Sequence, residues 1–235
     1  TKVQDEKECK LCGKKSIVIS GKLGVCVECL RSNEKEALEL AKKAHRYSRG
    51  MFGMPEEPPK DPKGLTCYVC ANRCSIPEGE IGFCGLVANR NGKLIRLAGT
   101  AERGVLEWYY DPLPTNCVAE FVCPGCTGRG YPKYAYSRNA EYGYYNLAVF
   151  YGACNLDCLF CQNWHYRRLV SKHEPVMTAK ELADKVHDKV SCVCYFGGDP
   201  SPQLQHALAS SILMLRKVKG RIFRVCWETN GLMSM

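Results

Sequence analysis

The sequence predicts an α/β fold, in which a partial parallel (β/α) barrel follows a small metal-stapled N-terminal domain. In the last third of the chain, apolar strand-like runs alternate with amphipathic helical segments, an order typical of parallel strands with helices packed on the sheet. In the first third, pairs of cysteines have the spacing of metal ligands. A chain of 235 residues, 46% of them hydrophobic, is long enough for one large domain and one small one.

Cysteine usage and charge restrict the class of protein. The 17 cysteines are odd in number and come in tight C-x2-C groups, which indicates metal ligands in a reducing compartment and argues against disulfides. The sequence shows no run of about 18 apolar residues and no leader with a cleavage site, so we expect a cytoplasmic protein without a membrane span. The formal charge of +9 would attract an anionic partner such as nucleic acid, although bound thiolates would offset much of it.

Residues 1–48 are predicted to form a small metal domain that ends in a helix. Four cysteines have C-x2-C-x13-C-x2-C spacing, which suits one tetrahedral site, and they are Cys9, Cys12, Cys26 and Cys29. The strand-like run 16–20 and the turn 21–24 would bring the two pairs together as a hairpin. A zinc ribbon and a rubredoxin-like iron site both fit, and a structural staple is favoured over nucleic-acid contact or electron relay. Apolar residues at helical spacing predict the helix over 33–47.

A linker over 49–64, rich in proline and glycine, precedes a cysteine-rich region over 65–140. One set in this region could fill a metal site alone with C-x2-C-x3-C-x9-C spacing, namely Cys67, Cys70, Cys74 and Cys84. A second set needs a fourth ligand from elsewhere, and its members are Cys117, Cys123 and Cys126. Zinc and an iron–sulfur cluster are both open for these sets. The segment 90–97, with Asn91-Gly92 at its turn, predicts a β-hairpin.

Residues 141–235 are predicted to hold the barrel, in which a cysteine loop follows the first strand. An apolar, β-rich run leads directly into the spacing C-x3-C-x2-C, formed by Cys154, Cys158 and Cys161. Three thiolates so close in sequence can bind three irons of a cubane cluster and leave the fourth iron open to an external ligand. A zinc site completed by another ligand is the alternative that the spacing alone leaves open.

Helices and strands are expected to alternate after this loop. The predicted elements are a helix over 178–190, a strand over 191–196, a helix over 202–219 and a strand over 222–227. Thr178 and Glu181 form a capping box at the start of the first helix. Each strand ends in a polar loop, and in such barrels the chemistry lies at the C-terminal ends of the strands. Three cysteines within these strands, Cys192, Cys194 and Cys226, are expected to be small core residues and not ligands.

The cysteine loop, with an aromatic residue, Phe160, directly before its third cysteine, resembles the cluster-binding loop of the radical S-adenosylmethionine (SAM) superfamily. The resemblance implies a partial barrel of the radical SAM type. It also implies a [4Fe-4S] cluster whose open iron chelates SAM and whose electron cleaves it to a 5'-deoxyadenosyl radical. By the same resemblance, Phe160 packs near the adenine, and no catalytic residue is assigned beyond the three cluster ligands.

The two polar loops are similar to further motifs of this family. Gly197, Gly198 and Asp199, followed by proline, resemble the GGEP segment that binds the methionine end of SAM, with aspartate in place of glutamate. The resemblance implies that the glycines let the backbone approach the ligand. Glu228 opens a segment that resembles the (D/E)TNG segment of glycyl-radical activating enzymes, where the acidic residue helps to organise the site and a bound monovalent cation.

Residues 67–231 look like uncharacterised radical enzymes related to the activating enzyme of pyruvate formate-lyase. This resemblance implies an oxidoreductase-type radical enzyme that abstracts hydrogen from a substrate, with a low-potential electron donor and auxiliary [4Fe-4S] clusters. A glycine on a partner polypeptide is the nearest analogy, while modification of a peptide, RNA, lipid or small molecule stays open. A non-enzymatic zinc-ribbon protein that binds nucleic acid is the other alternative. We expect the barrel to be incomplete at Met235, because a barrel of this type has more strands than the sequence predicts.

Overall fold

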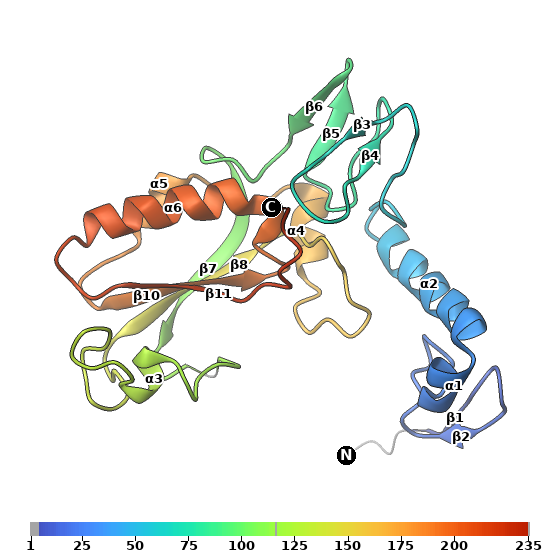
Figure 1. Cartoon of the computed structure of the whole chain (residues 1–235), viewed down its shortest axis with the longest axis horizontal. Coiled ribbons are helices and arrows are strands. Elements are labelled where there is room, and N and C mark those ends of the chain that lie inside the picture. The colour runs from blue at the N-terminus through green and yellow to red at the C-terminus, as the bar shows by residue number, and fades with distance from the viewer. Residues whose placement is uncertain (1–4, 116, 235) are drawn as a thin grey trace. The chain divides into compact units, whose positions relative to one another are not determined.

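The computed structural model describes residues 5–115 and 117–234, which fall into two compact units divided between Glu57 and Pro58 (Figure 1). The division lies inside the proline- and glycine-rich segment 49–64. Within the described part of the chain, no helix combines the length and the apolar character needed to cross a membrane.

The N-terminal unit consists of a short hairpin and two helices. Its elements are β1 (Lys7–Glu8), β2 (Lys15–Ser16), α1 (Val27–Ser32) and α2 (Glu34–Gly50). The helix expected over 33–47 is present as α2. The hairpin differs from the expected one, because residues 17–24 form turns and not a strand followed by a turn. The chain reverses earlier, at the first cysteine pair, where Gly13 has a left-handed φ of +73° that glycine adopts without strain.

A five-stranded mixed sheet organises the second unit, with strand order β11-β10-β8-β7-β9. Its strands are β7 (Gly104–Pro112), β8 (Tyr145–Tyr151), β9 (Val176–Met177), β10 (Val190–Gly197) and β11 (Arg224–Trp227). β8, β10 and β11 are parallel, as the alternation of helices and strands predicts, whereas β7 runs antiparallel to β8 and β9. The expected parallel barrel is therefore represented by three adjacent parallel strands, with the antiparallel β7 between β8 and the edge strand β9, and the described sheet does not close.

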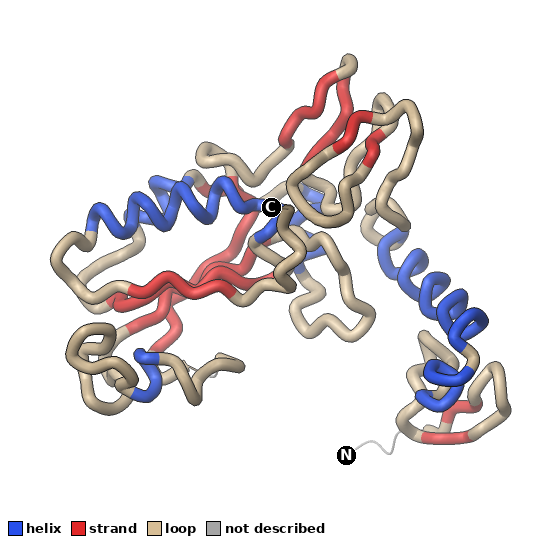
Figure 2. The backbone as a smooth tube through the Cα atoms, viewed as in Figure 1, coloured by secondary structure: helices blue, strands red, loops and turns tan. Residues whose placement is uncertain are grey.

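The helices α5 and α6 cover one face of this sheet, and the core lies between them and the strands (Figure 2). The helical segments are α4 (Tyr166–Lys172), α5 (Ala179–Asp184), the 3-10 turn Ser201–Gln203 and α6 (Leu204–Lys217). Thr178 and Glu181 form the predicted capping box. The helix that the sequence predicts over 178–190 is α5, and it ends earlier than expected, at Asp184, because the chain must turn before Val190 begins β10. Buried members of this core include Leu147, Val149, Leu182, Val186, Val193, Tyr195, Ala207 and Met214.

Small elements carry the cysteine-rich region. They are the pair β3 (Leu65–Thr66) and β4 (Ser75–Ile76), the hairpin β5 (Val87–Arg90) and β6 (Lys93–Arg96), and the single-turn helix α3 (Pro124–Thr127). The predicted Asn91-Gly92 turn is confirmed, since both residues have the positive φ that a tight hairpin turn requires, +53° and +67°.

Candidate metal centres

The cysteine loop leaves β8 at its carboxyl end, and its first cysteine is enclosed. Cys154 is 5% exposed, and the backbone N–H groups of Leu156 and Asp157 both lie 3.4 Å from its Sγ. Such donors stabilise a sulfur that carries negative charge. Burial raises the pKa of the Cys154 thiol to about 11. Metal binding at this position must therefore displace a proton, which makes it pH-dependent.

A buried ion pair holds the middle of the loop in place. Asp157 has a left-handed φ of +56° and no exposed surface. Its Oδ1 accepts hydrogen bonds from the Arg167 Nε at 2.8 Å and from the Tyr166 hydroxyl, both at the start of α4. The loop is thus anchored to the helix that follows it. Sequence reasoning missed this pair, because nothing in the spacing of the cysteines marks it.

The remaining two cysteines of the loop are more accessible than the first. Cys158 and Cys161 are half-buried, and the Cys161 N–H donates to the Cys158 carbonyl at 3.1 Å. Phe160, between them, is 87% exposed. One enclosed thiol with N–H groups at its sulfur and two thiols near solvent fit the ligand set of an iron–sulfur cluster with one open iron.

The glycine loop after β10 packs directly on the start of the cysteine loop. A Cβ on Gly198 would lie 2.1 Å from the Ala153 carbonyl oxygen, and one on Gly197 would lie 2.5 Å from the Tyr151 nitrogen. The Asp199 N–H also donates to the Ala153 carbonyl at 2.7 Å. These glycines are therefore required for close contact with the backbone at the end of β8. In this structure, backbone packing explains why glycine is needed at these two positions, whereas the resemblance implies that the glycines make room for a ligand.

The Asp199 side chain ties the second strand-end loop to the third. Asp199 is 3% exposed, and its Oδ1 accepts from the Ser201 N–H at 2.8 Å. Its Oδ2 accepts from the Asn230 N–H at 2.7 Å, and the Thr229 hydroxyl lies 3.1 Å from both oxygens. The Asp199 carboxylate thus accepts hydrogen bonds from groups of the protein itself. An aspartate, which is shorter than the glutamate of the GGEP pattern, suits this internal contact.

Asn155 joins the third loop to the cysteine loop. Its Oδ1 accepts from the Asn230 Nδ2 at 2.7 Å, and its backbone carbonyl accepts from the Asn72 Nδ2 at 2.6 Å. The loops that follow β8, β10 and β11 therefore form one hydrogen-bonded assembly, which the cysteine-rich region also contacts. Sequence reasoning missed both asparagines, although Asn155 directly follows the first cysteine of the loop.

The stretch that contains all three loops matches a known family. Residues 148–235 match the Radical SAM superfamily. The matched stretch begins within β8 and takes in the cysteine, glycine and E-T-N-G loops. The match covers less than half of the chain, and a domain of this superfamily implies a [4Fe-4S] cluster and SAM as cofactors.

Two curated relatives, both from Methanocaldococcus jannaschii, match parts of the chain. "Uncharacterized protein MJ0808" is 29% identical over 126 residues, which are 53% of this chain and 31% of that protein. "Uncharacterized protein MJ0674" is 30% identical over 90 residues, which are 35% of this chain and 25% of that protein. The matches thus span less than a third of the length of either relative. Among solved structures, none gives a significant match.

The N-terminal unit, which lies outside the matched stretch, holds a compact group of sulfurs. The Sγ atoms of Cys9, Cys12, Cys26 and Cys29 all lie within 4.8 Å of one another, and the pairs Cys9–Cys29 and Cys12–Cys26 are 3.8 and 3.7 Å apart. A single tetrahedral ion with bonds of about 2.3 Å holds its ligand sulfurs about 3.8 Å apart. This group therefore has the dimensions of a one-metal site.

The first cysteine set of the second unit also converges. Cys67, Cys70, Cys74 and Cys84 line one small enclosed cavity. Burial, and then the charges of the other three cysteines, raise the pKa of the Cys84 thiol to about 12. The segment adjoins the strand-end loops, since the Ala71 N–H donates to the Leu232 carbonyl at 2.9 Å. Four thiols around one cavity could hold a metal ion or a cluster.

Two members of the second cysteine set, Cys117 and Cys123, lie at a cavity that strand cysteines also line. Cys117 and Cys123 line a cavity of about 320 Å³ together with the strand residues Cys192, Cys194 and Cys226. We call this space, with these five cysteines, the thiol cavity. Cys192 and Cys194 are buried, as expected of core residues, and Cys226 is half-buried, but all three also line this cavity. Glu228 lies here as well, with its Oε1 3.1 Å from the Cys117 Sγ.

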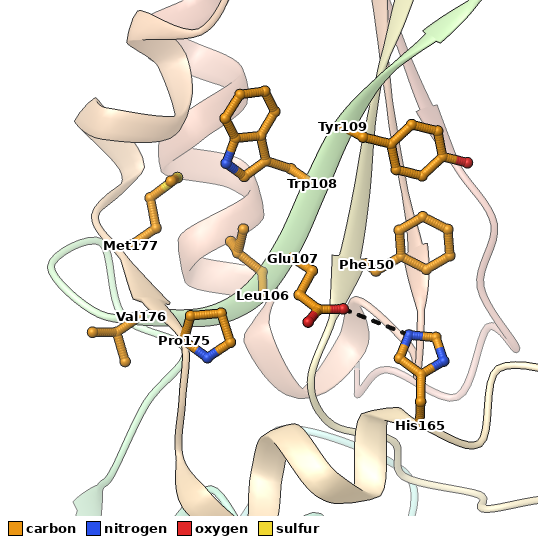
Figure 3. A pocket seen from close by; sticks show the side chains of 9 residues that line it. All are labelled: Leu106, Glu107, Trp108, Tyr109, Phe150, His165, Pro175, Val176 and Met177. Carbon is orange, nitrogen blue, oxygen red and sulfur yellow. Dashed lines mark ion pairs between the residues drawn. The ribbon is translucent and has the colours of Figure 1, made fainter.

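A separate hollow of about 590 Å³ lies along β7, where its edge is no longer covered by β9 (Figure 3). Figure 3 shows Glu107 and His165 facing each other there, with the Glu107 Oε2 and the His165 Nε2 4.0 Å apart. Phe150 and Trp108 supply apolar walls, and no cysteine lines this hollow. It can receive an organic group, but its described walls offer no thiol to a metal.

Proposed function

We propose that this protein is a radical SAM enzyme that reductively cleaves SAM and abstracts hydrogen from a substrate. Cys154, Cys158 and Cys161 would hold the [4Fe-4S] cluster. When bound, that cluster supplies the electron that converts SAM to methionine and a 5'-deoxyadenosyl radical. The observation that carries the proposal is the assembly of three strand-end loops around these thiols, through the hydrogen bonds of Asp199 and Asn155.

The chain's own residues contribute position and enclosure. Asp157 and Arg167 fix the conformation of the cysteine loop, which keeps the three thiols at the carboxyl end of β8. Gly198 allows the glycine loop to close on that loop without a side chain between them. Phe160 is exposed at the loop and offers an aromatic face against which an adenine can pack. Preorganised loops of this kind reduce the cost of orienting a ligand.

The substrate and the electron donor belong to the finer part of the proposal. We place the protein near the glycyl-radical activating enzymes, with a glycine of a partner polypeptide as the hydrogen donor and a low-potential protein as the electron source. The E-T-N-G segment after β11 supports this assignment. A peptide, RNA, lipid or small molecule is the alternative substrate, and the extra cysteine groups suit any of them. The N-terminal group would hold a structural zinc, or a rubredoxin-type iron.

The test is reduction of the anaerobically purified protein with a strong reductant in the presence of SAM. We expect 5'-deoxyadenosine to form, and we expect SAM to change the electron paramagnetic resonance (EPR) spectrum of the reduced cluster. Cys158→Ala should abolish both signals. Cys12→Ala, in the N-terminal group, is the matched control and should retain both. A Cys158→Ala protein that still shows the SAM-dependent spectrum would refute the assignment of the loop.

A further inference from the structure

The side chains of the parallel strands alternate between two faces, and the cysteines take the face opposite α5 and α6. On β10, Val193 and Tyr195 point into the core under α5 and α6, so Cys192 and Cys194 point the other way. Cys226 of β11 is the register partner of Cys194 and shares that face, because paired residues of neighbouring strands lie on one side of a sheet. Three thiols thus form a patch on two adjacent strands.

The segment after β7 carries three more thiols onto this patch. Figure 1 shows α3 and its flanking loops on the side of the sheet opposite α5 and α6. Glu228 Oε1 lies 3.1 Å from the Cys117 Sγ and 3.9 Å from the Cys194 Sγ, so it bridges the two groups. Cys117 and Cys123 line the same cavity as the three strand cysteines. Cys126 lies in α3, three residues after Cys123.

A buried glutamate fixes the segment against the strands. The Glu141 N–H donates to the Gly125 carbonyl, next to Cys126, at 2.9 Å. Its Oε2 accepts from the Ser191 hydroxyl of β10 at 2.7 Å and from the Arg224 Nη2 of β11 at 2.6 Å. These partners each precede a strand cysteine by one or two residues in sequence. The meeting of the two cysteine groups is thus a fixed feature of the fold.

We propose that Cys117, Cys123 and Cys126 form one metal–sulfur centre together with Cys192, Cys194 and Cys226, and that this centre is a polynuclear iron–sulfur cluster. The fourth ligand that the loop cysteines need comes from the strands. Ligating thiols lose their protons as the cluster forms. The site does not depend on radical SAM chemistry, since it rests on residues outside the cysteine loop.

The size of the site distinguishes a cluster from a single zinc ion. The ligand sulfurs of a tetrahedral zinc ion lie about 3.8 Å from one another. In the N-terminal unit the four sulfurs collapse to within 4.8 Å, whereas no such close group of three or more ligand atoms forms at the thiol cavity among the described residues. The cavity of about 320 Å³ instead leaves room for an inorganic core between the thiols. It also reaches Gln162 and Asn163, directly after the cysteine loop.

The test compares two triple variants with no substitution in common. One replaces the loop cysteines, C117A/C123A/C126A, and the other the strand cysteines, C192A/C194A/C226A. We expect both to lose the same amount of iron and acid-labile sulfide per chain, and the same EPR signal of the reduced protein. Val193→Ala, on the opposite face of β10, is the matched control for a buried truncation and should lose neither. All variants should retain the SAM-dependent spectrum of the cysteine loop.

Two results would overturn the proposal. Full retention of iron and sulfide in the strand variant would show that the loop cysteines act without the strands. Loss of zinc in place of iron from both variants would show that the centre is not an iron–sulfur cluster. If the triple strand variant fails to fold, the single variants Cys194→Ser and Cys226→Ser decide the question. At least one of them should shift the EPR signal that the loop variant removes, and unchanged spectra in both would refute the shared centre.

Discussion

The N-terminal cysteine group and the thiol cavity use the same side chain in opposite ways. In the N-terminal unit, two C-x2-C pairs close in sequence bring four sulfurs within 4.8 Å. In the second unit, the cysteines come from a loop after β7 and from two strands, and they surround open space. The first site follows from local spacing, and the second exists only when a sheet has its correct register. Metal binding should therefore depend on different parts of the chain in the two units.

The largest expected effect is the loss of the N-terminal unit when its metal is removed. Cys26→Ala removes one of four ligands, and structural metal sites of this kind contribute on the order of 10 kcal/mol to folding. We expect residues 5–57 to become susceptible to limited proteolysis in the full chain, while the iron content of the second unit stays unchanged. Lys14→Ala, which removes an exposed ion pair with Glu28, should leave the unit resistant. Resistance in the Cys26→Ala protein would show that packing alone holds the unit.

The next effect tests whether the thiol cavity depends on residues other than its cysteines. Glu141→Ala leaves Arg224 buried without its partner, so we expect the free energy of unfolding to fall by about 3–5 kcal/mol in urea titrations. Iron and sulfide at the thiol cavity should be lost as well, although no cysteine is changed. Asp188→Ala breaks the exposed pair with Arg221 and should change stability by less than about 0.5 kcal/mol. Wild-type iron content in a folded Glu141→Ala protein would contradict the dependence.

A smaller effect is expected at the glycine loop. A Cβ on Gly198 meets the Ala153 backbone, which cannot move aside as a flexible side chain can, so Gly198→Ala should cost about 3 kcal/mol. A Cβ on Gly220 would meet no neighbouring atom, so Gly220→Ala is disfavoured only by the left-handed φ and should lower the free energy of unfolding by about 1 kcal/mol. Urea titrations measure both. The SAM-dependent EPR change should weaken in the first variant only, and equal behaviour of the two would show that the close packing is dispensable.

The smallest effect is a pH dependence in the core beneath the sheet. Burial lowers the pKa of His206 to about 4, and its ring nitrogens contact the Tyr151 hydroxyl at 2.8 Å and the Met177 carbonyl at 3.0 Å. Between that pKa and the ordinary value of about 6.5, the unfolded chain binds a proton that the native state does not. Stability should therefore fall as the pH is lowered through this window, by about 1.4 kcal/mol at about pH 5.5. His206→Gln should lack this part of the pH dependence in parallel unfolding titrations.

Local signals in the sequence predicted local structure well. The capping box of Thr178 and the Asn91-Gly92 turn are both present, because each depends on residues within a few positions of one another. The C-x2-C pairs of the N-terminal unit predicted a group that the structure assembles. The antiparallel strand β7 was missed, since its pairing with β8 involves residues roughly forty positions apart, which no local pattern records.

By itself, the sequence predicted which stretch of the chain carries the motifs of a known family. The spacing of Cys154, Cys158 and Cys161 and the polar loops after two apolar strands indicated the stretch that matches the Radical SAM superfamily, because each motif is contiguous in the chain. Only the tertiary structure decided what each side chain contacts. It directed Asp199 into the protein, Glu228 toward Cys117, and the strand cysteines toward the thiol cavity. The reason is that side chains alternate along a strand, so the face that each one occupies depends on register and on which segment packs there.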